Sequence, residues 1–232
     1  MDGIKFGKLL SIASIIIASS SCSLSATAKI AAFGDSVTWG YGGLPGGWVL
    51  KLEGKSGIEI NNLAVPGETS EQGAKRIKNA LLTVPSVRTV IVMHGGNDWV
   101  RAFRTSPCDT HCTSDAVESK YENLGKNLLK IHSEITKSGR SVIFSTYWPS
   151  SSGACTQYTA KQFDMYQEHM HHLNQELIKA AKTTGSPIMR LDTLSEIAKR
   201  KENFFDCLHP NDSGYEIIAN KWMINSDILG DI

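Results

Sequence analysis

The sequence has little that would suit binding to nucleic acid or spanning a membrane. Its 232 residues carry 24 basic and 23 acidic side chains, and no stretch gathers basic and aromatic residues for a phosphate backbone. The one marked apolar run, Leu9–Ala18, is too short to cross a bilayer. Internal repeats, low-complexity tracts and interdomain linkers are also missing. We therefore expect no nucleic-acid partner, and a single globular domain of ordinary composition.

The first 28 residues have the pattern of a signal segment. Lys5 and Lys8 precede the apolar run, and small residues then lead to Ala26-Thr27-Ala28. Cleavage near Ala28 would leave residues 29–232 as the mature domain. The sequence thus predicts an exported protein, periplasmic or secreted.

Cys22 offers a second route for the same segment. It follows the apolar run directly and loosely resembles a bacterial lipoprotein processing site, although Ser19 stands where leucine is usual. Lipidation there would make the protein a membrane-anchored lipoprotein. Both routes export the chain.

Short β-type runs alternate with longer helical stretches in the mature sequence, a pattern typical of a parallel sheet with helices on both faces. We predict a sheet of five parallel strands in a single domain. The expected strands are Lys29–Phe33, Ile58–Val65, Arg88–His94, Arg140–Tyr147 and Pro187–Leu191. The expected helices are Trp48–Lys55, Ser70–Leu82, Ser114–Lys137, Thr159–Thr184 and Ser213–Asn225.

Polar motifs follow the expected strands, where ligands bind in such sheets. Gly34-Asp35-Ser36 comes after the first strand, Pro66-Gly67-Glu68-Thr69 after the second and Gly95-Gly96-Asn97-Asp98 after the third. Asp206-Cys207-Leu208-His209 lies near the end of the chain. We expect these four segments to meet at one edge of the sheet.

These segments supply every part that acyl transfer needs. Ser36 is the candidate nucleophile, His209 the base that takes its proton, and Asp206 the carboxylate that orients the imidazole. The backbone amides of Ser36 and Gly67 and the side-chain amide of Asn97 are candidate donors to the oxyanion. Taken singly, each of these residues is explained as well by a cap or a turn.

The four segments together resemble the SGNH or GDSL hydrolases, which are named for Ser, Gly, Asn and His in four blocks. The resemblance covers nearly the whole mature chain, although Val37 replaces the usual leucine of the first block. It implies a three-layer αβα fold of the flavodoxin-like kind, the triad of Ser36, Asp206 and His209, and the three oxyanion donors. The blocks look most like those of the exported bacterial lysophospholipase, thioesterase and arylesterase branch.

The expected activity is that of an exported serine esterase acting on acyl esters, lysophospholipids or thioesters, with no metal or cofactor. The first alternative is a carbohydrate O-acetylesterase with the same triad. The second, from another class, is an inactive cell-surface binding protein on the same fold. We expect a monomer whose partner is a small ester or lipid, with membrane anchoring only if Cys22 is lipidated.

The other four cysteines form an even set in a compartment where disulfides persist. We predict the pairs Cys155–Cys207 and Cys108–Cys112; the first would tether the loop of His209. Free thiols and a metal site at the second pair stay open as alternatives, although no further Cys/His pair at finger-like spacing follows.

Aromatic residues in the predicted site loops are candidates for substrate contact. We assign Trp39 and Trp99 to this group, and expect Trp48 and Trp148 to pack under the loops.

His169 and His172 share one face of a predicted helix. Because no third ligand stands at supporting spacing, we expect a solvated helix face there and no metal site.

Overall fold

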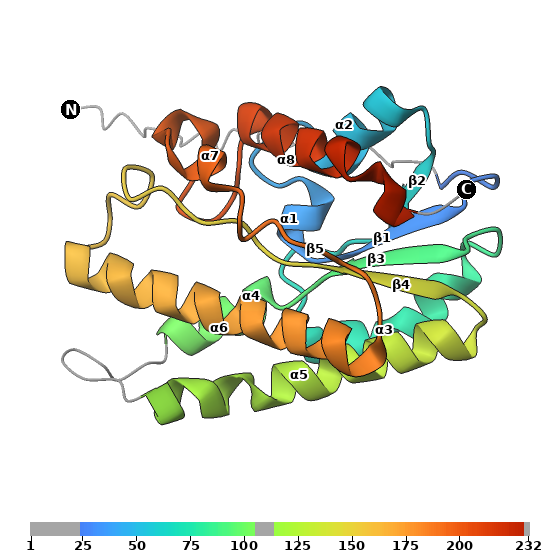
Figure 1. The fold of residues 1–232 in the computed structure, drawn as a ribbon, viewed down its shortest axis with the longest axis horizontal. Helices are drawn as coiled ribbons and strands as arrows, with labels where there is room; N and C mark the ends of the chain where they lie inside the picture. The colour runs from blue at the N-terminus through green and yellow to red at the C-terminus, as the bar shows by residue number, and fades with distance from the viewer. Residues whose placement is uncertain (1–23, 105–113, 230–232) are drawn as a thin grey trace, which may run out of the picture.

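The structure, a computed structural model, describes residues 24–104 and 114–229, without the side chains of residues 114–120. Five parallel strands form one sheet in the order β2-β1-β3-β4-β5, as Figure 1 shows. Their bounds are β1 Ile30–Gly34, β2 Ile60–Asn62, β3 Thr89–Met93, β4 Ser141–Ser145 and β5 Ile188–Met189. This order is that of flavodoxin-like sheets, so the predicted fold class is confirmed.

The strands are apolar because both faces of the sheet are covered. β1 reads Ile-Ala-Ala-Phe-Gly and is buried throughout, and β3 is buried from Val90 to Met93. The two strands pair in register, with Ala32 opposite Ile91. Neighbouring strands therefore end at nearly the same level, which brings the segments that follow them to one edge.

Helices form a layer on each face of the sheet (Figure 1). In one layer α5 packs between α3 and α6, and α4 packs against both α5 and α6. In the other layer α8 packs against α2 and α7. The bounds are α2 Gly47–Ser56, α3 Ser70–Leu82, α4 Gly96–Arg104, α5 Ser114–Lys137, α6 Ala160–Thr184, α7 Ser195–Ala198 and α8 Asp212–Ile224. The short helices α1 (Ser36–Trp39), α4 and α7 were not predicted.

Local sequence explains where the long helices begin. Thr69 and Thr159 each form a capping box, with Gln72 and Gln162 respectively. Asn211 caps α8 through bonds from the amides of the first turn. These caps place the site segments just outside the helices that follow them.

Tryptophans fill the core under the site loops. Trp48 stacks on Trp222 with ring centroids 5.4 Å apart, and Trp148 is also buried. The predicted packing of Trp48 and Trp148 is confirmed. Within residues 24–104 and 114–229, the longest helices are too polar to cross a membrane.

Candidate active site

The turn from β1 into α1 presents Ser36. Asp35 caps α1, because its Oδ1 accepts a hydrogen bond from the Val37 amide (3.2 Å). Ser36 is the first residue of the helix and so is not its cap. The Ser36 hydroxyl is thereby left for another partner, and its amide belongs to the first turn, which has no acceptor inside the helix.

Ser36, His209 and Asp206 form a continuous chain of hydrogen bonds. Ser36 Oγ lies 2.9 Å from His209 Nε2. On the other side of the ring, His209 Nδ1 lies 2.8 Å from Asp206 Oδ2. With Nδ1–H donating to the carboxylate, Nε2 can accept the proton of the serine hydroxyl.

The loop of Asp206 and His209 is folded around the carboxylate. Asp206 Oδ1 accepts from the backbone amides of Leu208 (2.8 Å) and His209 (2.7 Å). Partial burial opposes ionisation of Asp206, but the hydrogen bonds from His209 and Leu208 outweigh it and hold the pKa of the carboxyl below its ordinary value. The carboxylate therefore stays ionised beside the imidazole.

Two further contacts fix this loop to the rest of the molecule. The predicted disulfide between Cys155 and Cys207 is present and joins residues 52 apart in sequence. The Tyr166 hydroxyl on α6 donates to the Cys207 carbonyl (2.8 Å). Cys108 and Cys112 lie outside the described residues.

Asn97 and Gly67 meet through a shared neighbour. Asn97 stands in the first turn of α4, and its Nδ2 donates one proton to the Glu68 carbonyl (3.0 Å), while no described residue accepts the second proton. Gly67 sits at an exposed turn with φ of +79°, a conformation that suits glycine. The Glu68 amide closes this turn on the Val65 carbonyl (3.2 Å).

The Glu68 side chain anchors this turn from below. Arg76 donates to both carboxylate oxygens (2.6 and 2.7 Å), and buried His94 lies 3.1 Å from Oε2 through Nε2. Burial opposes ionisation of Glu68, but these partners outweigh it, so its pKa is below the ordinary value. Glu68 thus connects the turn of Gly67, the amide of Asn97 and the core.

Asp35 links the same region to the nucleophile turn. Its Oδ2 accepts from the Gly96 amide (3.0 Å) and from the Tyr147 hydroxyl (2.8 Å). Burial raises the pKa of Asp35 above its ordinary value, although nearby His94 and the hydrogen bonds to the carboxyl oppose this shift. The turns after β1 and β3 are therefore joined directly under the site.

A cavity of about 310 Å³ opens beside the hydroxyl of Ser36. Besides Ser36, Asn97, Asp206 and His209, its walls are largely aromatic and apolar; they consist of Trp99, Val100, Phe103, Arg104, Gln157, Tyr158, Tyr166, Cys207 and Leu208. Trp99 is one of the lining residues, with only 2% of its surface exposed. Trp39 is 38% exposed at the end of α1 and does not line the cavity. Gly67 does not line it either.

Sequence reasoning missed several residues of this site. Phe103 stands one helical turn after Trp99 on α4, and this i, i+4 spacing of aromatics was the available signal. Glu68 was visible only as part of the segment after the second strand. Nothing in the local sequence marked Tyr166, because it reaches the site through the packing of α6.

The prediction for His169 was wrong. Its side chain is 1% exposed, and its Nδ1 lies 2.9 Å from the hydroxyl of Tyr121 on α5. A neighbouring helix therefore covers this face of α6. His172, on the same face, is partly buried, and in the described part of the chain no three His, Cys, Asp or Glu side chains gather as a metal site would require.

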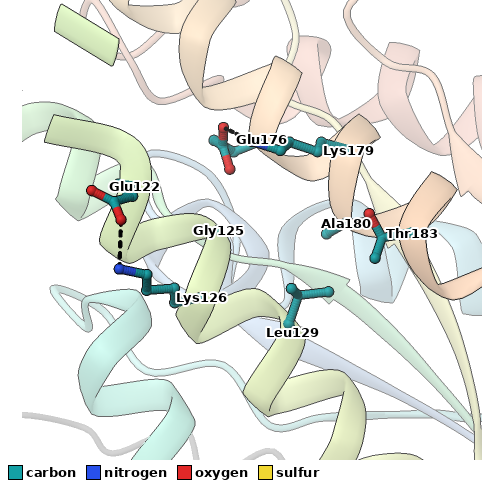
Figure 2. A pocket seen from close by; sticks show the side chains of 8 residues that line it. All are labelled: Glu122, Gly125, Lys126, Leu129, Glu176, Lys179, Ala180 and Thr183. Carbon is teal, nitrogen blue, oxygen red and sulfur yellow. Dashed lines mark hydrogen bonds and ion pairs between the residues drawn. The ribbon is translucent and has the colours of Figure 1, made fainter. Parts of the chain in front are cut away.

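A second hollow, of about 190 Å³, lies between α5 and α6 (Figure 2). Its charged side chains pair along their own helices, Lys126 with Glu122 (2.6 Å) and Lys179 with Glu176 (3.6 Å). None of the residues that line it belongs to the chain of hydrogen bonds around Ser36. The cavity beside Ser36 is therefore the one that we treat as the candidate active site.

Comparison with known structures finds the same fold. A lipolytic protein of the G-D-S-L family from Veillonella parvula shares 21% identity over 84% of this chain and 96% of its own, with a TM-score of 0.63. The lipase Lip_vut3 from a goat rumen metagenome shares 16% identity over 85% and 97%, with a TM-score of 0.65. The psychrotrophic esterase EstA from Pseudoalteromonas sp. shares 19% over 87% and 98%, with a TM-score of 0.62.

Comparison with curated protein sequences gives no match. The model of the GDSL-like lipase/acylhydrolase family matches residues 32–217, a range that runs from β1 into α8 and includes all four segments of the site. The chain therefore belongs to the GDSL-like lipase/acylhydrolase family and is a serine hydrolase of carboxylic esters.

Proposed function

We propose that the protein is an exported esterase that cleaves acyl esters through an acyl-enzyme on Ser36. His209 takes the proton of the Ser36 hydroxyl during attack on the ester carbonyl and gives it to the departing alcohol. Water activated by the same histidine then releases the acid. Asp206 holds the imidazole in the required tautomer.

One observation carries this proposal. The spacing of 2.9 Å from Ser36 to His209 and of 2.8 Å from His209 to Asp206 gives a proton path from hydroxyl to imidazole, with a carboxylate behind it. The cavity begins at these residues, so a substrate bound there has its carbonyl within reach of Ser36. This also argues against an inactive binding protein, which has no need of such an alignment.

Donors to the oxyanion come from three segments in this proposal. The free amide proton of Asn97 projects from the first turn of α4, and the Ser36 amide from the first turn of α1. Gly67 would supply the third donor from the turn beside Glu68. A preformed set of donors stabilises the tetrahedral intermediate without reorganisation.

The lining of the cavity favours an apolar acyl group. Trp99, Phe103 and Tyr158 are among the residues that line it, and Phe103 and Tyr158 meet edge-on with centroids 5.3 Å apart. A volume of about 310 Å³ exceeds what an acetyl group fills. We therefore propose acyl esters, with lysophospholipids and thioesters as members of the class, ahead of acetylated carbohydrates.

The residues before β1 bear on how the chain is exported. Ser25 exchanges hydrogen bonds with the Asn61 side chain (2.7 and 3.0 Å) and donates to Glu59 (2.7 Å), and Ala28 is buried. A cut after Ala28 would remove these contacts, whereas a cut before Cys22 would keep them. They support processing at Cys22, and the disulfide at Cys207 agrees with an oxidising compartment.

The position at which the signal segment is cleaved can be tested by measuring the intact mass of the protein purified from a bacterial membrane fraction. Processing at Cys22 predicts a chain that starts at this residue and carries acyl groups. The Cys22→Ala variant should then leave the membrane fraction. A mature chain that starts at Lys29 would contradict this part of the proposal.

Activity and substrate class are tested by one panel of esters. Purified protein is assayed on acetyl, butyryl and octanoyl esters, a lysophospholipid and an acetylated xylan. We expect the highest kcat/KM on butyryl or octanoyl esters and no activity in Ser36→Ala. An acetyl-only profile would favour the carbohydrate alternative, and full activity in Ser36→Ala would refute the proposed nucleophile.

A further inference from the structure

An exposed aromatic pair stands beside the candidate base and outside the cavity. The Tyr41 ring centroid lies 4.7 Å from that of His209, and Phe205 meets Tyr41 edge-on at 5.7 Å. Tyr41 is 44% exposed and Phe205 is 61% exposed, and neither lines the cavity. An apolar surface therefore faces solvent directly next to the catalytic imidazole.

The backbone under this pair is held firmly. The Tyr41 amide donates to the Ser36 carbonyl (2.9 Å), and the Tyr41 carbonyl accepts from the Tyr215 hydroxyl (2.7 Å). The Phe205 amide donates to the His209 carbonyl (2.9 Å). Both aromatic residues thus stand on backbone that is hydrogen-bonded to Ser36 and His209, which fixes the positions of their Cα atoms relative to the site.

The two segments also touch each other. A Cβ atom at Gly42, the residue after Tyr41, would lie 2.8 Å from the Cβ of Phe205 and 2.6 Å from the Pro210 carbonyl. Only a glycine at position 42 lets the segment that contains Tyr41 approach the loop of His209 this closely. The aromatic pair is therefore a joint feature of both segments.

The chemistry of ester cleavage gives this surface a use. In acylation, the bond from Ser36 Oγ to the carbonyl carbon forms and the bond from that carbon to the alcohol oxygen breaks. The serine proton passes through His209 Nε2 to the alcohol oxygen. The alcohol oxygen must therefore lie near Nε2, beside the ring on which Tyr41 packs.

The acyl group has its own place on the other side. Asn97, which would bind the oxyanion, lines the cavity together with Trp99 and Phe103. A carbonyl held by Asn97 directs its acyl chain along these walls, which leaves the alcohol to extend toward solvent past His209. We propose that Tyr41 and Phe205 bind the alcohol part of the substrate, and that this part is apolar or aromatic. This inference rests on the proposed function.

Two butyrate esters test the inference. 2-Phenylethyl and ethyl butyrate share the acyl group, and their alcohols are similar in acidity, so they differ chiefly in the size of the alcohol. We expect Phe205→Ala and Tyr41→Ala to lower the ratio of kcat/KM for the phenylethyl ester to that for the ethyl ester about five- to tenfold, the size of one aromatic contact. Phe205→Leu should give an intermediate ratio, and Tyr41→Phe should keep the wild-type ratio.

A second ratio separates the alcohol side from the acyl side. The ratio for ethyl octanoate to ethyl butyrate should stay within about twofold in Phe205→Ala, since the acyl chain occupies the cavity. Leu82→Ala is the matched control, because Leu82 is an exposed apolar residue at the far end of α3. Both ratios should be unchanged in this control.

The outcomes test this assignment of Tyr41 and Phe205 separately from the proposed esterase function. An unchanged phenylethyl ratio in Phe205→Ala, or a loss confined to the octanoyl ratio, would overturn the assignment while wild-type protein still reacts with a fluorophosphonate at Ser36. Absence of that reaction in wild-type protein would instead refute the proposed function. Thermal melts of each variant establish that a lower ratio of kcat/KM does not come from unfolding.

Discussion

The proposed oxyanion side of the site, Gly67 and Asn97, and the proposed base side, Asp206 and His209, are built by different means. Gly67 lies in the turn between β2 and α3, and Asn97 lies in the first turn of α4, which follows β3; the polar contacts of Glu68 join the two. Asp206 and His209 stand in a loop between η1 (Lys201–Asn203) and α8 that belongs to no strand of the sheet.

The two sides differ in which contacts hold their residues in position. The register of the sheet fixes where neighbouring strands end, and so it positions the segments that follow them. The loop of His209, 173 residues after Ser36, has no such support and is tied down by the disulfide at Cys207 and the hydroxyl of Tyr166. The base side therefore depends on long-range links, and the oxyanion side on the sheet.

Removal of the base should have the largest effect. We expect His209→Ala to lower kcat at least about 10⁴-fold, because the serine hydroxyl then has no proton acceptor. Steady-state kinetics on a butyryl ester measures this loss. Loss of less than tenfold in a folded variant would mean that another group serves as the base.

Removal of an oxyanion donor should cost less. Asn97→Ala is expected to lower kcat about 10²- to 10³-fold with little change in KM, because the donor acts on charge that develops in the transition state. The same assay measures it. A loss confined to KM would show that Asn97 binds the substrate and does not stabilise the oxyanion.

Release of the base loop should come next. In Cys155→Ala/Cys207→Ala we expect the free energy of unfolding to fall by about 2–5 kcal/mol, since the disulfide closes a long loop. We also expect kcat to fall about tenfold, because small displacements of catalytic groups are costly. Denaturant titration and kinetics measure the two effects, and full activity in the double variant would contradict the role of the tether.

Replacement of the oxyanion anchor should have the smallest effect on turnover. Glu68→Gln keeps the backbone carbonyl that Asn97 needs but loses the ion pair with Arg76, so we expect kcat to fall only a few-fold. The variant should also be less stable than wild type at pH 7.

The pH dependence of that stability follows from the lowered pKa of Glu68. A carboxyl with a lowered folded-state pKa stabilises the protein above its unfolded-state pKa, and this contribution is lost as pH falls through the folded-state value. The gap in unfolding free energy between wild type and Glu68→Gln should thus narrow below about pH 4. A gap that stays constant from pH 7 to pH 3 would contradict an ionised Glu68.

The sequence predicted the parts of the fold that depend on local pattern. α3 and α5 begin and end at the predicted residues, because a capping box or a long amphipathic repeat defines them locally. β2 and β5 are shorter than predicted, since pairing with one neighbour decides where a strand ends. The disulfide between Cys155 and Cys207 was predicted because both cysteines were expected to face the same edge of the sheet.

The parts that were missed depend on tertiary partners. Gly95-Gly96-Asn97-Asp98 has the composition of a turn, yet α4 begins at Gly96. The Gly96 amide donates a hydrogen bond to the buried carboxylate of Asp35. His169 was expected in solvent, but Tyr121 from α5 covers it. The ring of Tyr41 on His209 also joins residues far apart in sequence.

The central claim is that Ser36 is the nucleophile. Wild-type protein, His209→Ala and Asn97→Ala are treated with a fluorophosphonate, and the adduct is located by peptide mass spectrometry. We predict one adduct on Ser36 in wild type, a far slower reaction in His209→Ala and none at any other serine. An active protein labelled elsewhere, or not labelled at all, would contradict the account.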